Sequence, residues 1–493
     1  MSCQNEGMLT NEHAEILDVL IIGAGLSGIG AARHLQKHCP DKRWRIVDAR
    51  DAIGGTWDLF RYPGVRSDSD MYTLGYNFMP WKERKSIADG ATILRYLEKA
   101  ADAGQIRKKL HLGQRVVAAN WVSAEALWHV TLRSNDGRAS TRSAKFIYFC
   151  SGYYSYSTAH QPEFAGQGDF KGQIIHPQFW PQDLDYSGKR VVVIGSGATA
   201  MTLVPEMAKT AAHVTMLQRS PTYVISRPSV DSIAIALNKV LPSRWAYAIT
   251  RWKNVLMGMY FYSVSQRKPA AVKAYLLGLV RKVMGENYDV DKHFSPSYGP
   301  WDQRVCVVPD SNLFQQIKSG RAEIITDTIE RFTSEGIVLS SGQVLPADII
   351  VTATGLKLEC LDGVAISLDG AAYAPGQAMA YKGLMLSGLP NAALAFGYIN
   401  ASWTLRADLS SEYLCRLLHH MDRQAYRMVT PKADPSVSAK PFMALSSGYV
   451  QRSQAHLPKQ GDIAPWRVLP SYLADLMALR WRKLDDGVLR FEN

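Results

Sequence analysis

The chain has 493 residues, of which 47% are hydrophobic and 20% are charged. This ordinary globular composition excludes a disordered or fibrous protein, and the length predicts about two to four domains. The longest uncharged apolar run that we identify, residues 255–264, is much shorter than the ~20 residues that a membrane-spanning helix needs. Residues 1–15 contain acidic side chains where a signal peptide has a basic and then an apolar stretch, so we expect a cytoplasmic protein.

Charge and cysteine content exclude further classes of protein. Lys and Arg number 56 against 44 Asp and Glu, which leaves a net charge of +12, but no run of five basic residues occurs. We interpret the excess as a basic surface and expect no nucleic-acid partner. The six cysteines form no CxxC or CxxxxC pair, so we expect neither a metal site nor the dithiol centre of a disulfide reductase.

A first dinucleotide-binding unit is predicted near the N-terminus. The apolar residues 17–22 predict a buried parallel strand, and the glycine turn GAGLSG that follows leads into a helical pattern. Its glycines allow a tight turn, the approach of a pyrophosphate, and close packing of helix on strand. They are Gly23, Gly25 and Gly28. A second strand, at residues 44–47, ends at Asp48, whose carboxylate would accept the ribose hydroxyls and repel a 2′-phosphate.

The same pattern recurs after the apolar residues 190–194, in the turn GSGATA. The residues of this turn that we expect at the cofactor are Gly195, Gly197, Thr199 and Ala200. Here the second strand, residues 214–217, is followed by Arg219 and Ser220 in place of an acid. A cation and a hydroxyl at this position favour a 2′-phosphate, so the second unit is predicted to bind NADPH.

The fold class follows from the two units taken together. Two further apolar strands end in the small-residue turns FCSG (149–152) and VTATG (351–355), where we expect the chain to cross between domains. This is the layout of flavoproteins with one FAD and one NADPH domain. We therefore predict an α/β fold with two Rossmann-like dinucleotide-binding domains, of which the FAD domain is discontinuous, and a helical insert.

The segment between the two units carries a fingerprint with the spacing FxGxxxHxxxWP. Its residues are Phe170, Gly172, His176, Trp180 and Pro181. A second motif, GxWxxxxYPGxxxD, includes Gly55, Trp57 and Asp68. With these motifs the chain resembles a type I Baeyer–Villiger monooxygenase. The resemblance extends along nearly the whole chain and is strongest to the bacterial ethionamide-activating group of that family.

The resemblance implies a reaction between reduced flavin and dioxygen to give a peroxyflavin, which requires a dry site and a cationic partner. The arginine that supplies this charge in the family matches Arg304 in PWDQRVCVV, and the aspartate that orients it matches Asp68. Gly55, Trp57 and Asp68 are expected at the FAD. Where many family members have a lysine before the arginine, this chain has Gln303, so its preference for NADPH would depend mainly on Arg219.

Other interpretations of these residues stay open at this point. Arg304 could be a surface arginine, and Asp68 could cap a helix that begins near Asp70. We assign His176 a conformational or packing role on the interdomain linker, since the chemistry needs no general base there. Trp57 and Trp180 are expected to serve packing more than substrate contact. Lys357 is expected to be a surface residue.

Domain boundaries follow from these motifs and from a helical stretch at residues 231–300, which has ten Lys or Arg and four Asp or Glu. We favour a helical subdomain that closes over the active site, with peripheral contact to an anionic membrane as the alternative. We also predict a helix at residues 409–421. The expected units are FAD domain 1–155 and 380–493, linker 156–184, NADPH domain 185–230 and 301–379, and insert 231–300.

The sequence thus predicts an NADPH-consuming, FAD-dependent Baeyer–Villiger monooxygenase. Its substrates would be dioxygen and a small hydrophobic ketone, which gives an ester or lactone, with sulfoxidation of thioethers or thiocarbonyls as a further activity. One alternative is a flavin monooxygenase that oxygenates only nitrogen or sulfur. The other is a flavin redox sensor that does not oxygenate.

Overall fold

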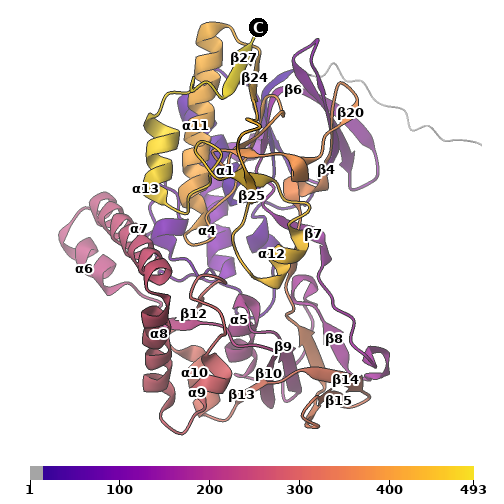
Figure 1. The fold of residues 1–493 in the computed structure, drawn as a ribbon, viewed down its shortest axis with the longest axis vertical. Coiled ribbons are helices and arrows are strands. Elements are labelled where there is room, and N and C mark those ends of the chain that lie inside the picture. Colours follow the sequence, from indigo (N-terminus) through magenta and orange to yellow (C-terminus); the bar gives the residue numbers. More distant parts are fainter. Residues whose placement is uncertain (1–14) are drawn as a thin grey trace, which may run out of the picture.

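Two β-sheets, each built around one of the predicted glycine turns, form the framework of the molecule (Figure 1). The structure, a computed structural model, describes residues 15–493. The expectation of a cytoplasmic protein depends on residues 1–15, and all of these except Glu15 lie outside the described residues. Within residues 15–493, no helix is both long and apolar enough to cross a membrane.

The first sheet has a parallel part at its centre and an antiparallel part beside it. Its central strand β1 (Leu17–Ile22) pairs in parallel with β2 (Trp44–Val47) and with β6 (Ala139–Phe149). All six residues of β1 are buried, as the apolar pattern predicts. The other strands of this sheet are β3 (Leu110–His111), β4 (Gln114–Val122), β5 (Leu127–Ser134), β19 (Ala365–Leu368), β20 (Ala371–Ala372) and β23 (Ala392–Leu394).

Helix α1 (Leu26–His38) begins at the first glycine turn and packs against α11 (Trp403–Gln424). Helix α11 is longer than the predicted helix at residues 409–421. Its first turns contain the buried polar residues Thr404, Arg406 and Asp408, so apolar periodicity did not reveal them. The other helices of this part are α2 (Thr56–Leu59), α3 (Met71–Leu74), α4 (Gly90–Ala103), α12 (Gly448–Ser453) and α13 (Tyr472–Asp475).

The second sheet is entirely parallel and has five strands in the order β13-β10-β9-β17-β8. They are β8 (Gln173–Ile175), β9 (Arg190–Ile194), β10 (His213–Gln218), β13 (Ala322–Thr326) and β17 (Ile349–Thr352). Helix α5 (Ala198–Met207) follows the second glycine turn, as predicted. Accompanying elements are β11 (Val224–Arg227), β12 (Cys306–Pro309), α10 (Asn312–Lys318), β14 (Ile329–Thr333), β15 (Gly336–Leu339) and β16 (Val344–Pro346).

Strand pairing departs from two of the expected domain boundaries. Strand β8 lies in the second sheet, although residues 156–184 were expected to be a linker. Strand β19 pairs with β4 in the first sheet, although residues 301–379 were expected in the NADPH domain. The reason is that the chain crosses back directly after the VTATG turn, where β18 (Leu356–Leu358) pairs with β7 (Tyr154–Ala159). The small strand pairs of the C-terminal part are β21 (Ala380–Tyr381) with β22 (Met385–Leu386), β24 (Met428–Pro431) with β27 (Leu489–Glu492), and β25 (Ala439–Pro441) with β26 (Lys459–Gly461).

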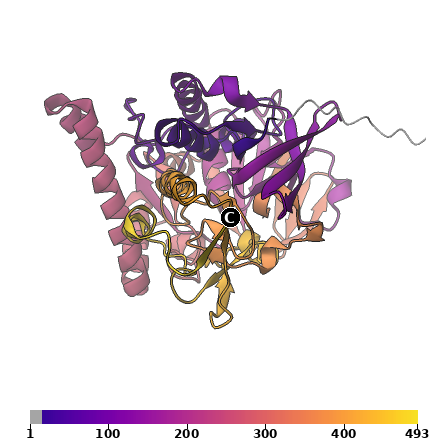
Figure 2. The ribbon, with the colours of Figure 1, turned by 90° about the horizontal axis from the view of Figure 1, so that it is seen from above.

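Residues 231–300 are helical, as expected. The helices are α6 (Ser232–Val240), α7 (Ser243–Arg267), α8 (Pro269–Met284) and α9 (Val290–Phe294). Helix α7 contacts α3 beside the first sheet, and α8 contacts β11 beside the second. Figures 1 and 2 show that α6 and α7 project sideways from the body of the molecule.

Candidate active site

A cavity of about 330 Å³ connects the two dinucleotide-binding units. One part of its wall is formed by the first glycine turn and the GTW segment, and another by the N-terminal end of α5. Lining residues that the sequence predicts at the site are Gly23, Gly25, Asp48, Gly55, Trp57, Asp68, Thr199 and Arg304. A cavity at the carboxyl ends of parallel strands is where open α/β sheets bind their ligands.

The first glycine turn leaves room for a pyrophosphate. Gly23 has φ +108°, which favours glycine, and a Cβ atom there would lie 2.6 Å from the carbonyl oxygen of Cys150. On Gly28 a Cβ atom would lie 1.8 Å from the carbonyl oxygen of Gly23, so helix and turn touch. Gly25 precedes α1 and no side chain caps this helix. Amide groups at its N-terminus therefore suit an anionic group, and the turn fits an adenine dinucleotide such as FAD.

Asp48 lies where the sequence predicts it, directly after β2 and at the cavity wall. Its Oδ2 accepts a hydrogen bond from the Ala24 amide at 2.6 Å, and its Oδ1 accepts one from the Arg50 amide at 2.8 Å. Burial raises the pKa of Asp48, although these two hydrogen bonds oppose the shift. The carboxylate therefore holds the glycine turn as well as facing the cavity.

The second glycine turn also begins with a glycine that has a positive φ and lies close to a neighbouring carbonyl oxygen. Gly195 has φ +131°, and a Cβ atom there would lie 2.4 Å from the carbonyl oxygen of Ala353. A Cβ atom on Gly197 would meet nothing within 4 Å, so the approach to the N-terminus of α5 is open. Arg219 and Ser220 follow β10 and are exposed, outside the cavity. This exposed cation fits a 2′-phosphate at the outer end of a dinucleotide.

Arg304 is not a surface arginine, because it lies in the cavity wall just before β12. Its Nη2 donates a hydrogen bond to the Tyr153 hydroxyl at 3.0 Å, and the hydroxyls of Tyr153 and Tyr154 lie 2.8 Å apart. The ring of Tyr153 stacks on Trp403, with centroids 5.1 Å apart. Tyr153 raises the pKa of Arg304 above its ordinary value, against the effect of burial. A guanidinium held in this way keeps its charge.

Asp68 lines the same cavity, and the alternative role as a helix cap is wrong. Asp70 is the residue that caps α3, since its Oδ1 accepts a hydrogen bond from the Thr73 amide at 3.1 Å. Burial raises the pKa of Asp68 to about 6, although the charges of Arg66 and Arg304 lower it. Asp68 is thus coupled to Arg304 through the electric field inside the cavity.

The fingerprint residues lie outside the cavity wall. The Nδ1 atom of His176 accepts a hydrogen bond from the Gln178 amide at 3.2 Å, and its Nε2 lies 3.2 Å from the carbonyl oxygen of Gly355. Burial lowers the pKa of His176, which favours the neutral ring that this pairing requires. His176 therefore joins the linker to the crossing turn.

Three of the remaining fingerprint residues, Phe170, Gly172 and Trp180, serve packing. Phe170 is buried near Phe332, and Trp180 packs against the core of the second sheet. A Cβ atom on Gly172 would lie 2.4 Å from the carbonyl oxygen of Asp348. Pro181 is exposed. Lys357 is exposed as predicted.

One expectation needs correction, and two residues of the site were not predicted. None of the residues 231–300 lines the cavity, so the expected lid over the active site is not formed by these helices in this structure. The tyrosines that hold Arg304 were also missed. Tyr153 and Tyr154 directly follow the FCSG turn at the carboxyl end of β6, and this position next to a predicted crossing was the signal that could have identified them.

The comparisons with known proteins agree with this geometry. Residues 18–361 match the model of the "Flavin-binding monooxygenase-like" family. The chain is 52% identical to the FAD-containing monooxygenase EthA of Mycobacterium tuberculosis (strain ATCC 25618 / H37Rv) over 97% of this chain and 98% of that protein. An oxidised steroid monooxygenase bound to NADP has the same fold, with a TM-score of 0.75 and 22% identity over 97% of this chain and 100% of that one. Cyclohexanone monooxygenase bound to ε-caprolactone gives a TM-score of 0.73 and 20% identity over the same shares of the two chains.

Proposed function

This chain belongs to the flavin-binding monooxygenase-like family, and on that premise we propose that it is a Baeyer–Villiger monooxygenase that converts ketones to esters or lactones. Its cofactors are FAD and NADPH. FAD, once reduced by NADPH, supplies the activation of dioxygen. Thioethers and thiocarbonyl compounds are proposed as further substrates.

The observation that carries the proposal is the position of Arg304 in the wall of a cavity that both glycine turns reach. Oxygen insertion into a ketone develops negative charge on oxygen atoms, and a permanent cation in a poorly hydrated site stabilises that charge strongly. Tyr153 fixes one arm of the guanidinium at 3.0 Å and so orients it before the reaction. This preorganisation removes the cost of turning a cation toward the charge.

Asp68 is proposed to position Arg304 by charge rather than by a direct hydrogen bond. With a pKa of about 6, Asp68 is mostly ionised at neutral pH and attracts the guanidinium toward its side of the cavity. The same cavity is also lined by the apolar side chains of Trp57, Leu74 and Trp403. Such walls exclude water from the reacting centre, which limits the loss of reducing equivalents to hydrogen peroxide.

Arg219 is proposed to select NADPH over NADH. It is exposed directly after β10, the second strand of the unit that carries the turn GSGATA. The neighbouring Gln218 does not compete for the nucleotide, because its Nε2 donates to the carbonyl oxygen of His293 and to the Thr326 hydroxyl, both at 2.8 Å. Arg219 is therefore the cation available at this position.

The proposal is tested by product analysis with two substrates. Purified holoenzyme is supplied with NADPH, air and either a medium-chain ketone or a thioether, and the products are identified by gas chromatography with mass spectrometry. We expect an ester from the ketone, with sulfoxide from the thioether. Sulfoxide without any ester assigns the chain to the heteroatom-oxygenating class, and hydrogen peroxide as the sole product with both substrates contradicts an oxygenase.

A further inference from the structure

Helix α7 is amphipathic in an unusual sense, because its apolar stripe faces away from the protein. The stripe recurs every three or four residues and consists of Trp245, Ile249, Trp252, Leu256 and Tyr260. All five are exposed, up to 63% for Trp245 and 73% for Tyr260. We call these five residues the α7 stripe. A surface helix normally turns its apolar face toward the core.

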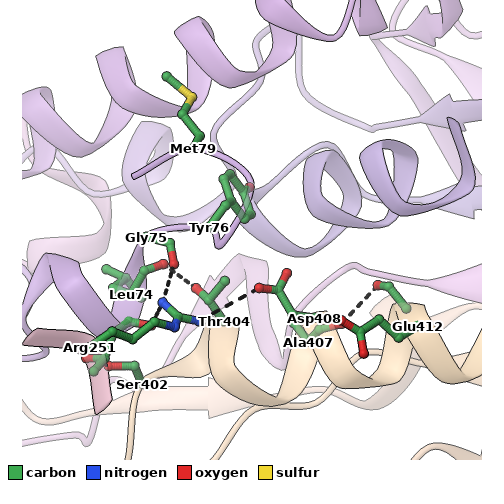
Figure 3. Close-up of polar contacts among 12 residues, drawn as sticks. Leu74, Gly75, Tyr76, Met79, Arg251, Ser402, Thr404, Ala407, Asp408 and Glu412 are labelled. Carbon is green, nitrogen blue, oxygen red and sulfur yellow. Dashed lines mark hydrogen bonds and ion pairs between the residues drawn. The ribbon is translucent and has the colours of Figure 1, made fainter. Parts of the chain in front are cut away.

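The inner face of α7 is fixed by polar contacts, so the helix cannot simply turn its stripe inward. Arg251 is buried, and its Nη1 donates hydrogen bonds to the carbonyl oxygens of Tyr72 at 2.8 Å and Gly75 at 2.7 Å. Its Nη2 lies 3.9 Å from Asp408 on α11 (Figure 3). If α7 rotated, these buried groups would lose their partners, at a cost of several kcal/mol.

A second exposed apolar stripe lies beside the first. It follows α13 into the adjoining helical turns and consists of Leu473, Met477 and Trp481. The ring of Tyr472, also on α13, contacts that of Trp252 at a centroid distance of 5.7 Å. Figure 1 shows α13 and α7 on the same side of the molecule. The two stripes therefore lie on neighbouring helical segments, and we treat them together as one apolar face; exposed apolar faces of this kind mark interaction sites.

Basic residues lie at the ends of the two helical segments that carry the stripes. Arg244, Arg267, Lys268, Arg482 and Lys483 are exposed, and no salt bridge among the described residues involves them. Lys253 differs, because its Nζ lies 2.6 Å from Asp231. Residues 231–300 together carry ten basic and four acidic side chains. A second copy of this chain would bring like charges together at this face, whereas an anionic surface would be attracted to it.

We propose that the face formed by the α7 stripe and by Leu473, Met477 and Trp481 docks this enzyme on the surface of an anionic lipid bilayer. Tryptophan and tyrosine favour the boundary between headgroups and acyl chains, and lysine and arginine favour anionic headgroups. The face lies on the surface of the bilayer and does not cross it, which agrees with the finding on spanning helices in residues 15–493. Docking is independent of the reaction proposed above.

The test is co-sedimentation of the full-length holoenzyme with vesicles made of equal parts of phosphatidylglycerol and phosphatidylcholine. The variant Trp245→Gln/Leu256→Gln removes part of the stripe. The control Val344→Gln/Ile463→Gln removes two side chains of similar exposure elsewhere. We expect the stripe variant to bind roughly tenfold or more weakly than the parent, since apolar burial drives insertion, and the control to bind as the parent does. Turnover of a short, water-soluble ketone by all three proteins verifies that they are folded.

A second variant tests the charges. Arg244→Gln/Arg267→Gln should weaken binding to the anionic vesicles and leave binding to pure phosphatidylcholine vesicles unchanged, and added salt should mimic this variant. Failure of the parent protein to sediment with anionic vesicles overturns the proposal, as does equal binding by the stripe variant and the control. If the parent is an oligomer that the stripe variant dissociates, without vesicle binding by either, the face is an interface between copies and the proposal is wrong.

Discussion

Replacement of Arg304 by Met removes the proposed stabilising charge and keeps a flexible side chain in the cavity wall. A unit charge about 4 Å from a developing oxyanion is worth about 4 kcal/mol at an effective dielectric constant of about 20. Loss of a single preorganised donor in enzyme sites costs a factor of about 10² to 10³ in kcat. Because the Arg304 guanidinium is held by Tyr153 at 3.0 Å, we expect Arg304→Met to lower the rate of ester formation by about this factor.

The assay follows NADPH consumption, hydrogen peroxide and ester in the same reaction. We expect Arg304→Met to oxidise NADPH and to release hydrogen peroxide instead of ester. Two matched variants separate the contributions of charge and orientation. Arg304→Lys keeps the positive charge but not the planar guanidinium group, and Tyr153→Phe keeps Arg304 but removes its hydrogen bond. Both should retain more ester formation than Arg304→Met. Ester formation by Arg304→Met at the parent rate would refute the reasoning.

Three further predictions concern the nucleotide, the carboxylate and the linker. Arg219→Ala should raise the KM for NADPH by the factor that corresponds to a loss of about 1–3 kcal/mol of binding free energy, the value of a charged hydrogen bond, and should leave the KM for NADH unchanged. An equal rise of KM for both nucleotides contradicts the assignment. For Asp68, the folded-state pKa of about 6 exceeds the ordinary value of 3.8, so its stabilising contribution is full below pH 3.8 and is lost as the pH rises through 6. Between pH 3.8 and 6, the free energy of unfolding of the parent, measured with denaturant, should fall by roughly 3 kcal/mol relative to that of Asp68→Asn. If the free energies of the two proteins instead change in parallel with pH, the carboxylate is not buried in this way. His176→Ala should lower the free energy of unfolding by about 1–3 kcal/mol, because it leaves the buried Gln178 amide and the half-buried Gly355 carbonyl without this partner, while the pH profile of kcat stays unchanged; a lost limb in that profile would indicate a general base.

The two glycine turns illustrate what local sequence could predict. Glycine at positions 23 and 195 is required by the positive φ and by the close approach of a neighbouring carbonyl, and the apolar strands before these turns are buried on both faces. Such constraints act within a few residues, so they leave a pattern in the sequence. The ends of β1, β2 and β9 were therefore predictable.

The environment of Arg304 was less predictable, because its partners come from distant parts of the chain. Tyr153 is 151 residues away in sequence, and Trp403 reaches the same place from the first turn of α11. No local periodicity encodes such contacts. The outward stripe of α7 was missed for another reason: its apolar residues have ordinary helical spacing. The buried residues on the opposite face, Tyr247 and Arg251 among them, reveal which side faces the solvent.

The measurement that tests the central claim most directly is isotope transfer. The purified holoenzyme is incubated with NADPH, ¹⁸O₂ and a medium-chain ketone, and the product is examined by mass spectrometry. The account predicts an ester that carries one ¹⁸O atom, formed in proportion to the NADPH consumed. Unlabelled ester, or consumption of NADPH that yields hydrogen peroxide and no ester, would contradict it.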